Sequence, residues 1–88
     1  MHLGHERTLV RLVEGADGWV ARSEAKRLTR DLDQFREVIV VFNGVEQIGQ
    51  GFADEVFRVW QNEHPDVHLV PVNMKESVRL LVERARRG

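Results

Sequence analysis

The run that decides the fold lies between Glu37 and Trp60 and reads EVIVVFNGVEQIGQGFADEVFRVW. Its first part, EVIVVF at residues 37–42, is apolar on both alternations, which predicts a central strand covered on both faces or nearly so. The part from Phe52 to Asn62 predicts a helix. Between them, Gly49 and Gly51 indicate a loop whose backbone something can approach closely. Three kinds of group are candidates for this close approach: a phosphate, a substrate and another protein.

The segments before this run predict a hairpin and a first helix. RTLVRLVEG, residues 7–15, is β-prone and is followed by a turn and by Trp19-Val20, which together indicate two antiparallel strands. SEAKRLTRDLDQF, residues 23–35, repeats apolar side chains at the three-four spacing of one helical face. Ser23 is the expected N-cap of that helix.

The segments after this run predict a strand and a last helix. VHLVPV, residues 67–72, is extended, and Pro71 assigns it to an edge of the sheet because proline cannot donate to a ladder. Asn73 and Glu76 have the spacing of a capping box, and the helix that follows turns Met74, Val78, Leu81, Val82 and Ala85 inward.

Together these segments predict a small α/β fold in the order β-β-α-β-α-β-α. We expect about four strands in a largely parallel or mixed sheet and about three helices, with parallel strands joined by right-handed crossovers. The chain of 88 residues is long enough for one domain, residues 1–88. The expected core comprises Leu28, Leu32, Ile39, Val41, Phe57, Trp60, Leu69 and Leu81.

Composition excludes several classes of function. The 13 Lys and Arg residues and 14 Asp and Glu residues give a net charge of −1, so no overall field draws in nucleic acid or an anionic membrane. The absence of cysteine excludes disulfides and thiolate metal sites. The longest apolar run, residues 38–42, is far shorter than the ~20 residues of a membrane span. We expect a cytoplasmic protein.

The glycine loop lacks the motifs of a nucleotide site. A P-loop needs Lys and a hydroxyl after its last glycine, but Phe52-Ala53 follow Gly51. A dinucleotide fingerprint needs a third glycine where Asp54 stands, and an aspartate there repels an anion. We therefore expect no nucleotide cofactor at this loop.

No other constellation predicts catalysis or metal binding. Asp54 and Glu55 are adjacent, so on a helix they point about 100° apart and cannot form a catalytic dyad. Asp54 is expected to pair with Arg58 one turn later. The histidine pairs at positions 2 and 5 and at positions 64 and 68 are interpreted as surface residues, so no metal is expected. The sequence predicts a protein that is not an enzyme.

Three stretches give the chain a family resemblance. ARSEAKRL at residues 21–28, FREVIVVFNGVEQIGQGFADEVFRVW at residues 35–60 and HPDVHLVPVN at residues 64–73 resemble a bacterial STAS-like domain of unknown function. The resemblance extends from Trp19 to Leu81, and IGQGFADE at residues 48–55 is its most specific part. The family is similar to the STAS domains of anti-sigma-factor antagonists and sulphate transporters.

That resemblance gives the glycine loop a role in docking. In STAS domains an Asp-Ser-Ser-Gly-like run leads into the helix, and a partner kinase phosphorylates its second serine. Aligned without a gap, Gly49 stands at the aspartate, Gln50 at the first serine and Gly51 at the phosphorylated serine. No Ser or Thr lies between Thr29 and Ser77. The resemblance therefore implies a docking loop that has lost the phosphorylation switch.

The function predicted on this basis is a non-enzymatic, regulatory protein-interaction module. The resemblance implies a protein partner such as a GHKL-type ATPase, a kinase-like protein or a transcription-regulatory protein. The alternative is a small-ligand or nucleotide-binding domain, or an enzyme subunit, that uses the loop from Gln47 to Glu55. A homodimer through the Pro71 edge or through an exposed helix face is compatible with the first function. The residues expected to bind the partner are Gln47, Ile48, Gly49, Gln50, Gly51, Phe52, Asp54 and Glu55.

Overall fold

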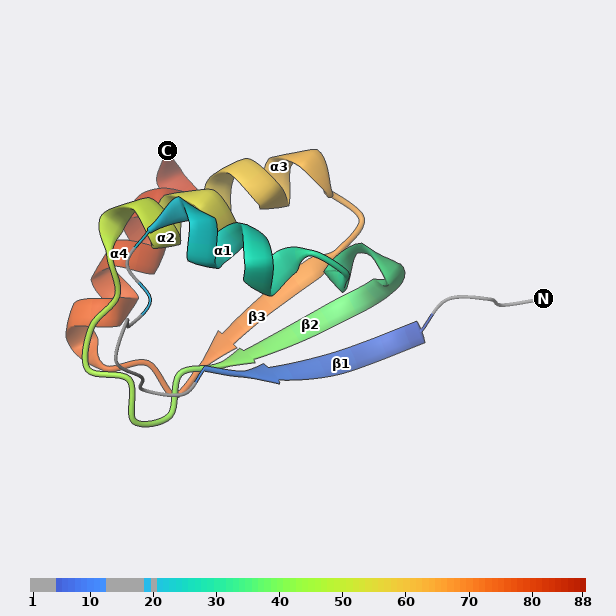
Figure 1. The fold of residues 1–88 in the computed structure, drawn as a ribbon. Helices are drawn as coiled ribbons and strands as arrows, with labels where there is room; N and C mark the ends of the chain where they lie inside the picture. The colour runs from blue at the N-terminus through green and yellow to red at the C-terminus, as the bar shows by residue number, and fades with distance from the viewer. Residues whose placement is uncertain (1–4, 13–18, 20) are drawn as a thin grey trace.

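A three-stranded parallel sheet with its helices on one side forms the framework of the protein (Figure 1). The computed structural model describes residues 5–12, 19 and 21–88. The elements, in chain order, are β1 (His5–Arg11), α1 (Arg22–Thr29), the 3₁₀ turn η1 (Leu32–Gln34), β2 (Phe35–Val41), α2 (Gln50–Asp54), the π-helix η2 (Glu55–Trp60), α3 (Gln61–Glu63), β3 (His68–Val72) and α4 (Glu76–Arg87).

The strands lie in the order β1-β2-β3, and both neighbouring pairs are parallel. The four strands and the mixed sheet expected from the sequence are not confirmed. β1 pairs with β2 rather than with Trp19, which lies in a bend. The end of the expected first strand and the turn, residues 13–18, and Val20 of the expected second strand lie outside the described residues. β3 is an edge strand, as Pro71 predicts.

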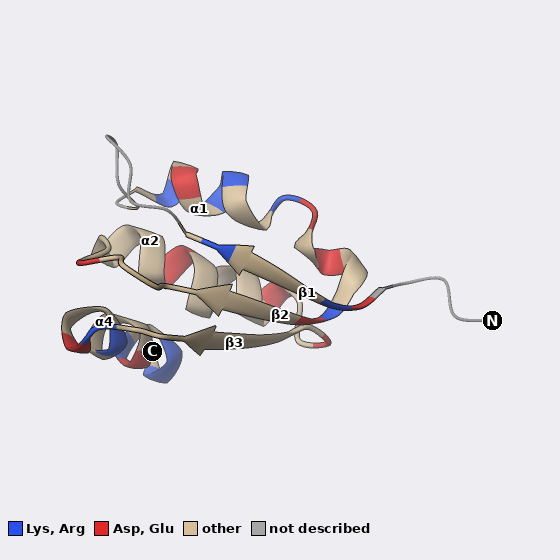
Figure 2. Ribbon diagram, turned by 90° about the horizontal axis from the view of Figure 1, so that it is seen from below, with Lys and Arg blue, Asp and Glu red and all other residues tan. Residues whose placement is uncertain are grey.

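The described helices cover only one face of the sheet, whereas the sequence predicted a central strand covered on both faces or nearly so. Val38, Val40 and Phe42 face the helices and are buried. On the other face, Leu9, Ile39 and Val70 form one row across the three strands, and Leu9 is 54% exposed. Figure 2 views this uncovered face. Each crossover returns over the same side of the sheet, so the described residues form two layers rather than three.

The core lies between the sheet and the helices. Leu32, Phe57, Trp60 and Leu69 belong to it as expected, and Leu28 and Leu81 pack against its margin. The last helix turns Val78, Val82 and Ala85 into the core, as its spacing predicts. Ile39 and Val41 point to the other face of β2 and are absent from this cluster, but Val41 is only 7% exposed and so is buried as expected.

α2, η2 and α3 form one continuous helical stretch, Gln50–Glu63, which we call the middle helix. It lies between α1 and α4 (Figure 1), and its six-residue π-helical segment was not predicted. Phe52 is 0% exposed, so the wide apolar surface of this helix is explained by two neighbouring helices and the sheet. π-helical turns are rare and occur frequently at functional sites.

The starts of α1 and α4 differ from the sequence-based expectation. Ala21 is the N-cap of α1, and its backbone N–H donates to Glu24 Oε1 at 2.7 Å. Ser23 lies inside the first turn. Lys75 is the N-cap of α4, while Asn73 adopts φ 58°, a left-handed conformation that asparagine tolerates in turns. The expected capping box is therefore replaced by a turn at Asn73.

The described residues contain no helix with the combined length and apolar character needed to cross a membrane. The last helix, α4, has only 12 residues, several of them arginines.

Candidate functional site

The loop between β2 and the middle helix lies at the carboxyl edge of the parallel sheet, the edge where such sheets usually bind their ligands. It begins with a tight turn in which the Val45 N–H donates to the Phe42 carbonyl at 2.9 Å. Gly44 lies inside this turn with φ +83°, which side chains rarely tolerate. The turn directs the chain away from β2 toward Gln50.

Neighbouring segments hold the loop on two sides. On one side, the Gly49 N–H donates to the Trp19 carbonyl at 2.8 Å. On the other side, Ser77 Oγ donates to the Glu46 carbonyl at 3.0 Å, and Lys75 Nζ lies 3.7 Å from Glu46 Oε2. Ser77 therefore holds the loop in place, a role that was not predicted.

The residues expected to bind a partner divide into exposed and buried groups. Gln47 and Gln50 are exposed, whereas Ile48 is buried under the loop. Phe52 is fully buried and its ring lies 5.6 Å from that of Trp19, so it cannot meet a partner directly. Gly49 and Gly51 are half-buried. The accessible part of the expected site is thus the polar tip of the loop.

Asp54 and Glu55 are held in ion pairs. Arg58 Nε and Nη2 lie 2.5 and 2.7 Å from the two carboxylate oxygens of Asp54, which confirms the expected pair one turn apart. Arg22 Nη1 lies 2.8 Å from Asp54 Oδ2 and 3.4 Å from Glu55 Oε1. The hydrogen bond from Arg58, helped by Arg22, lowers the pKa of Asp54 to about 2 against the effect of burial. Both carboxylates therefore stabilise helix packing.

The hydroxyl groups that flank this region in the sequence, on Thr29 and Ser77, are already engaged. Thr29 is buried, and its Oγ1 donates to the Ala25 carbonyl at 3.0 Å. Ser77 donates to Glu46 as described above. Within the part of the chain that the structure describes, no group of three or more His, Cys, Asp or Glu residues is placed to hold a metal ion.

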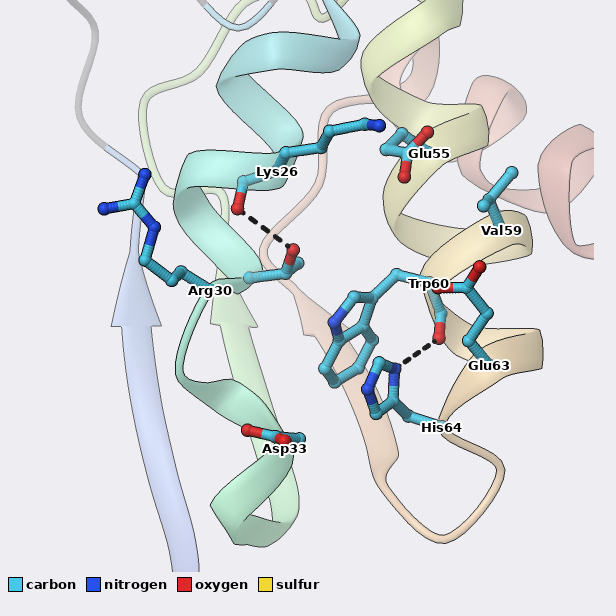
Figure 3. A pocket seen from close by; sticks show the side chains of 9 residues that line it. Lys26, Arg30, Asp33, Glu55, Val59, Trp60, Glu63 and His64 are labelled. Atoms are coloured by element: carbon cyan, nitrogen blue, oxygen red, sulfur yellow. Dashed lines mark hydrogen bonds between the residues drawn. The ribbon is translucent and has the colours of Figure 1, made fainter.

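A second feature, a groove between α1 and the middle helix, was not predicted. It has a volume of about 320 Å³, and Lys26, Glu55, Trp60 and His64 contribute to its lining (Figure 3). The rings of Trp60 and His64 stack at 4.3 Å. The signal that could have indicated this contact is their spacing of four residues at the end of a helix. The sequence interpretation considered His64 only as a surface histidine.

Comparison with protein families matches residues 24–79, more than half of the chain, to the STAS-like domain of unknown function. No curated protein and no solved structure is similar enough to the chain to count as a match. The matched range includes the sheet strands β2 and β3, the glycine loop, the middle helix and the contacts that join Asp54 to Arg58. The chain belongs to the family of STAS-like domains of unknown function.

Proposed function

We propose that the chain is a non-enzymatic, regulatory protein-interaction module that docks a partner through the tip of the glycine loop. The observation that carries this proposal is the combination of a preformed loop with an exposed polar tip. Gln47 and Gln50 are accessible, while hydrogen bonds at Glu46 and Gly49 hold the backbone on either side. A surface that is ordered before binding loses less conformational entropy when a partner arrives.

The composition of the loop favours docking over chemistry. Residues 43–51 contain no hydroxyl, thiol, imidazole or lysine side chain, and the nearby carboxylates of Asp54 and Glu55 already have arginine partners. Amide side chains such as Gln47 and Gln50 both donate and accept hydrogen bonds, which suits recognition of another protein. The partner proposed is a GHKL-type ATPase, a kinase-like protein or a transcription-regulatory protein, in keeping with the resemblance to anti-sigma-factor antagonists.

This regulatory module would lack the usual switch of STAS domains. Gly51 occupies the position of the phosphorylated serine, and neither it nor Gln50 can accept a phosphoryl group. Docking would therefore be regulated by something other than phosphorylation at the loop.

The small-ligand alternative has less support at this loop. The hollow beside it, lined by Gln50, Asp54 and Arg84 among others, has a volume of only about 60 Å³. Pockets that hold nucleotides and other drug-sized molecules are typically ~300 Å³ or larger. A nucleotide would have to bind on an open surface next to Asp54.

A homodimer through the edge of β3 also has less support than docking at the loop. Pro71 offers no N–H to an added strand, and Arg86 Nη2 already donates to the Leu69 carbonyl at 2.7 Å. Two of the backbone groups along this edge are therefore unable to pair with a second chain.

The experiment that tests the proposal is capture of partners from a native lysate by the parent chain and by two variants. Gln50→Arg adds a long charged side chain at the loop tip, and Asn62→Arg adds the same side chain at an exposed site near the other end of the middle helix. We expect Gln50→Arg to lose a partner that the parent and Asn62→Arg both retain. Retention of every partner by Gln50→Arg would mean that the loop is structural.

A further inference from the structure

The groove between α1 and the middle helix contains a buried aromatic side chain whose polar atom has no partner. Trp60 is only 7% exposed, and its indole Nε1–H makes no hydrogen bond with any described residue. Among the described residues, every side-chain nitrogen or oxygen atom with no exposure to solvent has a hydrogen-bond partner. Because Nε1 has no such partner, it must be accessible, and it therefore opens into the groove that Trp60 lines. Figure 3 shows this nitrogen on the side of the ring that points toward α1. Buried tryptophans usually satisfy this donor, so an open one indicates a place for a ligand.

His64 supplies an acceptor beside this donor. Its Nδ1 lies 3.0 Å from the Trp60 carbonyl oxygen, which can only accept, so Nδ1 carries the proton of the neutral ring. Nε2 then carries a lone pair, and this atom lies on the same side of the stacked rings as the indole nitrogen (Figure 3). The floor of the groove therefore presents a hydrogen-bond donor and an acceptor together.

Charged groups of both signs flank this floor. Figure 3 shows Lys26 extending from α1 toward Glu55 on the middle helix, and Asp33 lines the groove from η1. Neither side chain forms an ion pair with a residue that the structure describes. Glu63 adds another carboxylate to the lining, while Glu55 is already paired with Arg22. Unpaired charges of both signs thus line the groove.

We propose that this groove binds a small zwitterion, a free amino acid or a compound of that chemical class. Its carboxylate would accept from Lys26 and from Trp60 Nε1–H, and its ammonium group would donate to Asp33 and to His64 Nε2. Such a ligand would satisfy the open donor and acceptor and both unpaired charges at once. The site is separate from the docking tip at Gln47 and Gln50, so the proposal goes beyond the function proposed above.

Size and charge disfavour the other ligand classes. A volume of about 320 Å³ is at the small end of ligand pockets, which suits an amino acid better than a nucleotide. A phosphate or other simple anion would be repelled by the carboxylates of Asp33, Glu55 and Glu63. A metal cation has no suitable cluster of ligands there, because no three His, Asp or Glu residues among those that the structure describes are placed to hold one.

Tryptophan fluorescence tests this proposal because the chain has two tryptophans, Trp19 and Trp60. In a Trp19→Phe variant the only emission comes from Trp60 in the floor of the groove. Each of the twenty common amino acids is titrated to about 10 mM, which detects even millimolar binding. The melting temperature of the unmodified chain is measured with the same probes, so that any damage caused by replacing Trp19 does not decide the result. We expect at least one amino acid to change the emission and to raise the melting temperature.

The site is then assigned with matched variants and probes. Lys26→Met and Asp33→Asn should each weaken binding about tenfold or more, because each removes one charged anchor. Arg27→Met, next to Lys26 on α1 but outside the lining, should leave the affinity within about twofold. The N-acetylated and amidated forms of the bound amino acid, which each keep one charge, should bind at least about tenfold more weakly.

Three results would overturn the proposal. The first is that none of the twenty amino acids changes either signal. The second is that Lys26→Met and Asp33→Asn bind as tightly as the parent. The third is that a derivative with a single charge binds as well as the free amino acid.

Discussion

Arg22 Nη1 lies 2.8 Å from Asp54 Oδ2, which joins the first turn of α1 to the middle helix. The two residues come from ARSEAKRL and IGQGFADE, two of the stretches that carry the family resemblance. The same guanidinium group lies 3.4 Å from Glu55 Oε1, at the start of the π-helical segment. The contact shows that these separate motifs stabilise one arrangement of helices beside the glycine loop.

The ion pairs of Asp54 with Arg58 and Arg22 predict how the stability of the fold depends on pH. The pKa of Asp54 is lowered from 3.8 to about 2 in the folded protein, chiefly by the hydrogen bond from Arg58. Because the pKa is lower in the folded protein, the charged Asp54 side chain contributes its full stabilisation above about pH 4. This stabilisation is lost as the pH falls through about 2. The Asp54 side chain is 20% exposed. After allowing for solvent screening, we expect its charge to contribute about 1 kcal/mol to the free energy of unfolding.

The measurement is urea unfolding of the parent and of Asp54→Asn at several values of pH. At pH 7 the variant should be less stable by about 1 kcal/mol, and the difference should shrink between about pH 4 and pH 2. Asp66→Asn, at an exposed site outside this ion-pair network, is the control. A difference that persists unchanged at the lowest pH would show that the Asp54 charge is not the cause.

Burial of Phe57 predicts a large loss of stability on truncation. Phe57 is 2% exposed, its ring lies 6.3 Å from that of Phe42, and the Arg86 guanidinium lies 5.4 Å from its centre. Phe57→Ala should lower the free energy of unfolding by ~3–5 kcal/mol. Leu9→Ala on the uncovered sheet face should change it by less than about 0.5 kcal/mol. Thermal melting of both variants checks this, and nearly equal melting temperatures would contradict the described core.

Two glycines beside the loop should respond differently to substitution. Gly44 has φ +83°, so Gly44→Ala should destabilise the fold by about 1 kcal/mol or more. Gly49 has φ −83° and ψ 154°, which any residue adopts, so Gly49→Ala avoids this backbone strain. The test is the melting temperature of each variant. If Gly49→Ala lowered the melting temperature more than Gly44→Ala, then close contact of the added methyl group with neighbouring atoms, rather than backbone conformation, would limit substitution here.

The loop should take up no phosphate. Residues 49–52 have no hydroxyl, so incubation with a STAS-type kinase and ATP should yield no phosphopeptide that covers them. Thr29 is 3% exposed and Ser77 is hydrogen-bonded to Glu46, so the flanking hydroxyls are expected to react poorly. Mass spectrometry of the digested protein measures this. A phosphopeptide at Ser77 would reveal a switch beside the loop, because modification there would break its bond to Glu46.

The parts of the fold that depend on local patterns could be predicted from the sequence. The spacing of apolar residues predicted the helices, except that the first helix ends at Thr29 and does not continue to Phe35, and Pro71 correctly assigned β3 to an edge. That helices cover only one face of β2 could not be predicted, because Ile39 on the other face is as apolar as the buried Val38 and Val40. Strand order, which is not visible in any one segment, decides which of the two faces the helices cover.

The candidate site was predicted less completely. The sequence predicted the loop and the pair between Asp54 and Arg58, but it treated Phe52 as a residue that could meet a partner. Burial of Phe52 follows from α1 and α4 on either side of the middle helix, which are distant in the chain. The groove at Trp60 was missed because Lys26 and His64 come together only through tertiary packing.

The most direct test of docking at the loop is the affinity of the parent, Gln50→Arg and Asn62→Arg for one purified partner from the capture experiment, measured by calorimetric titration. The melting temperatures of the three chains are compared first, since a folded Gln50→Arg variant is required. If the loop tip is the docking surface, Gln50→Arg should bind at least about tenfold more weakly than the parent, and Asn62→Arg should bind within about twofold of it. Equal affinities of the parent and Gln50→Arg would contradict docking at this loop.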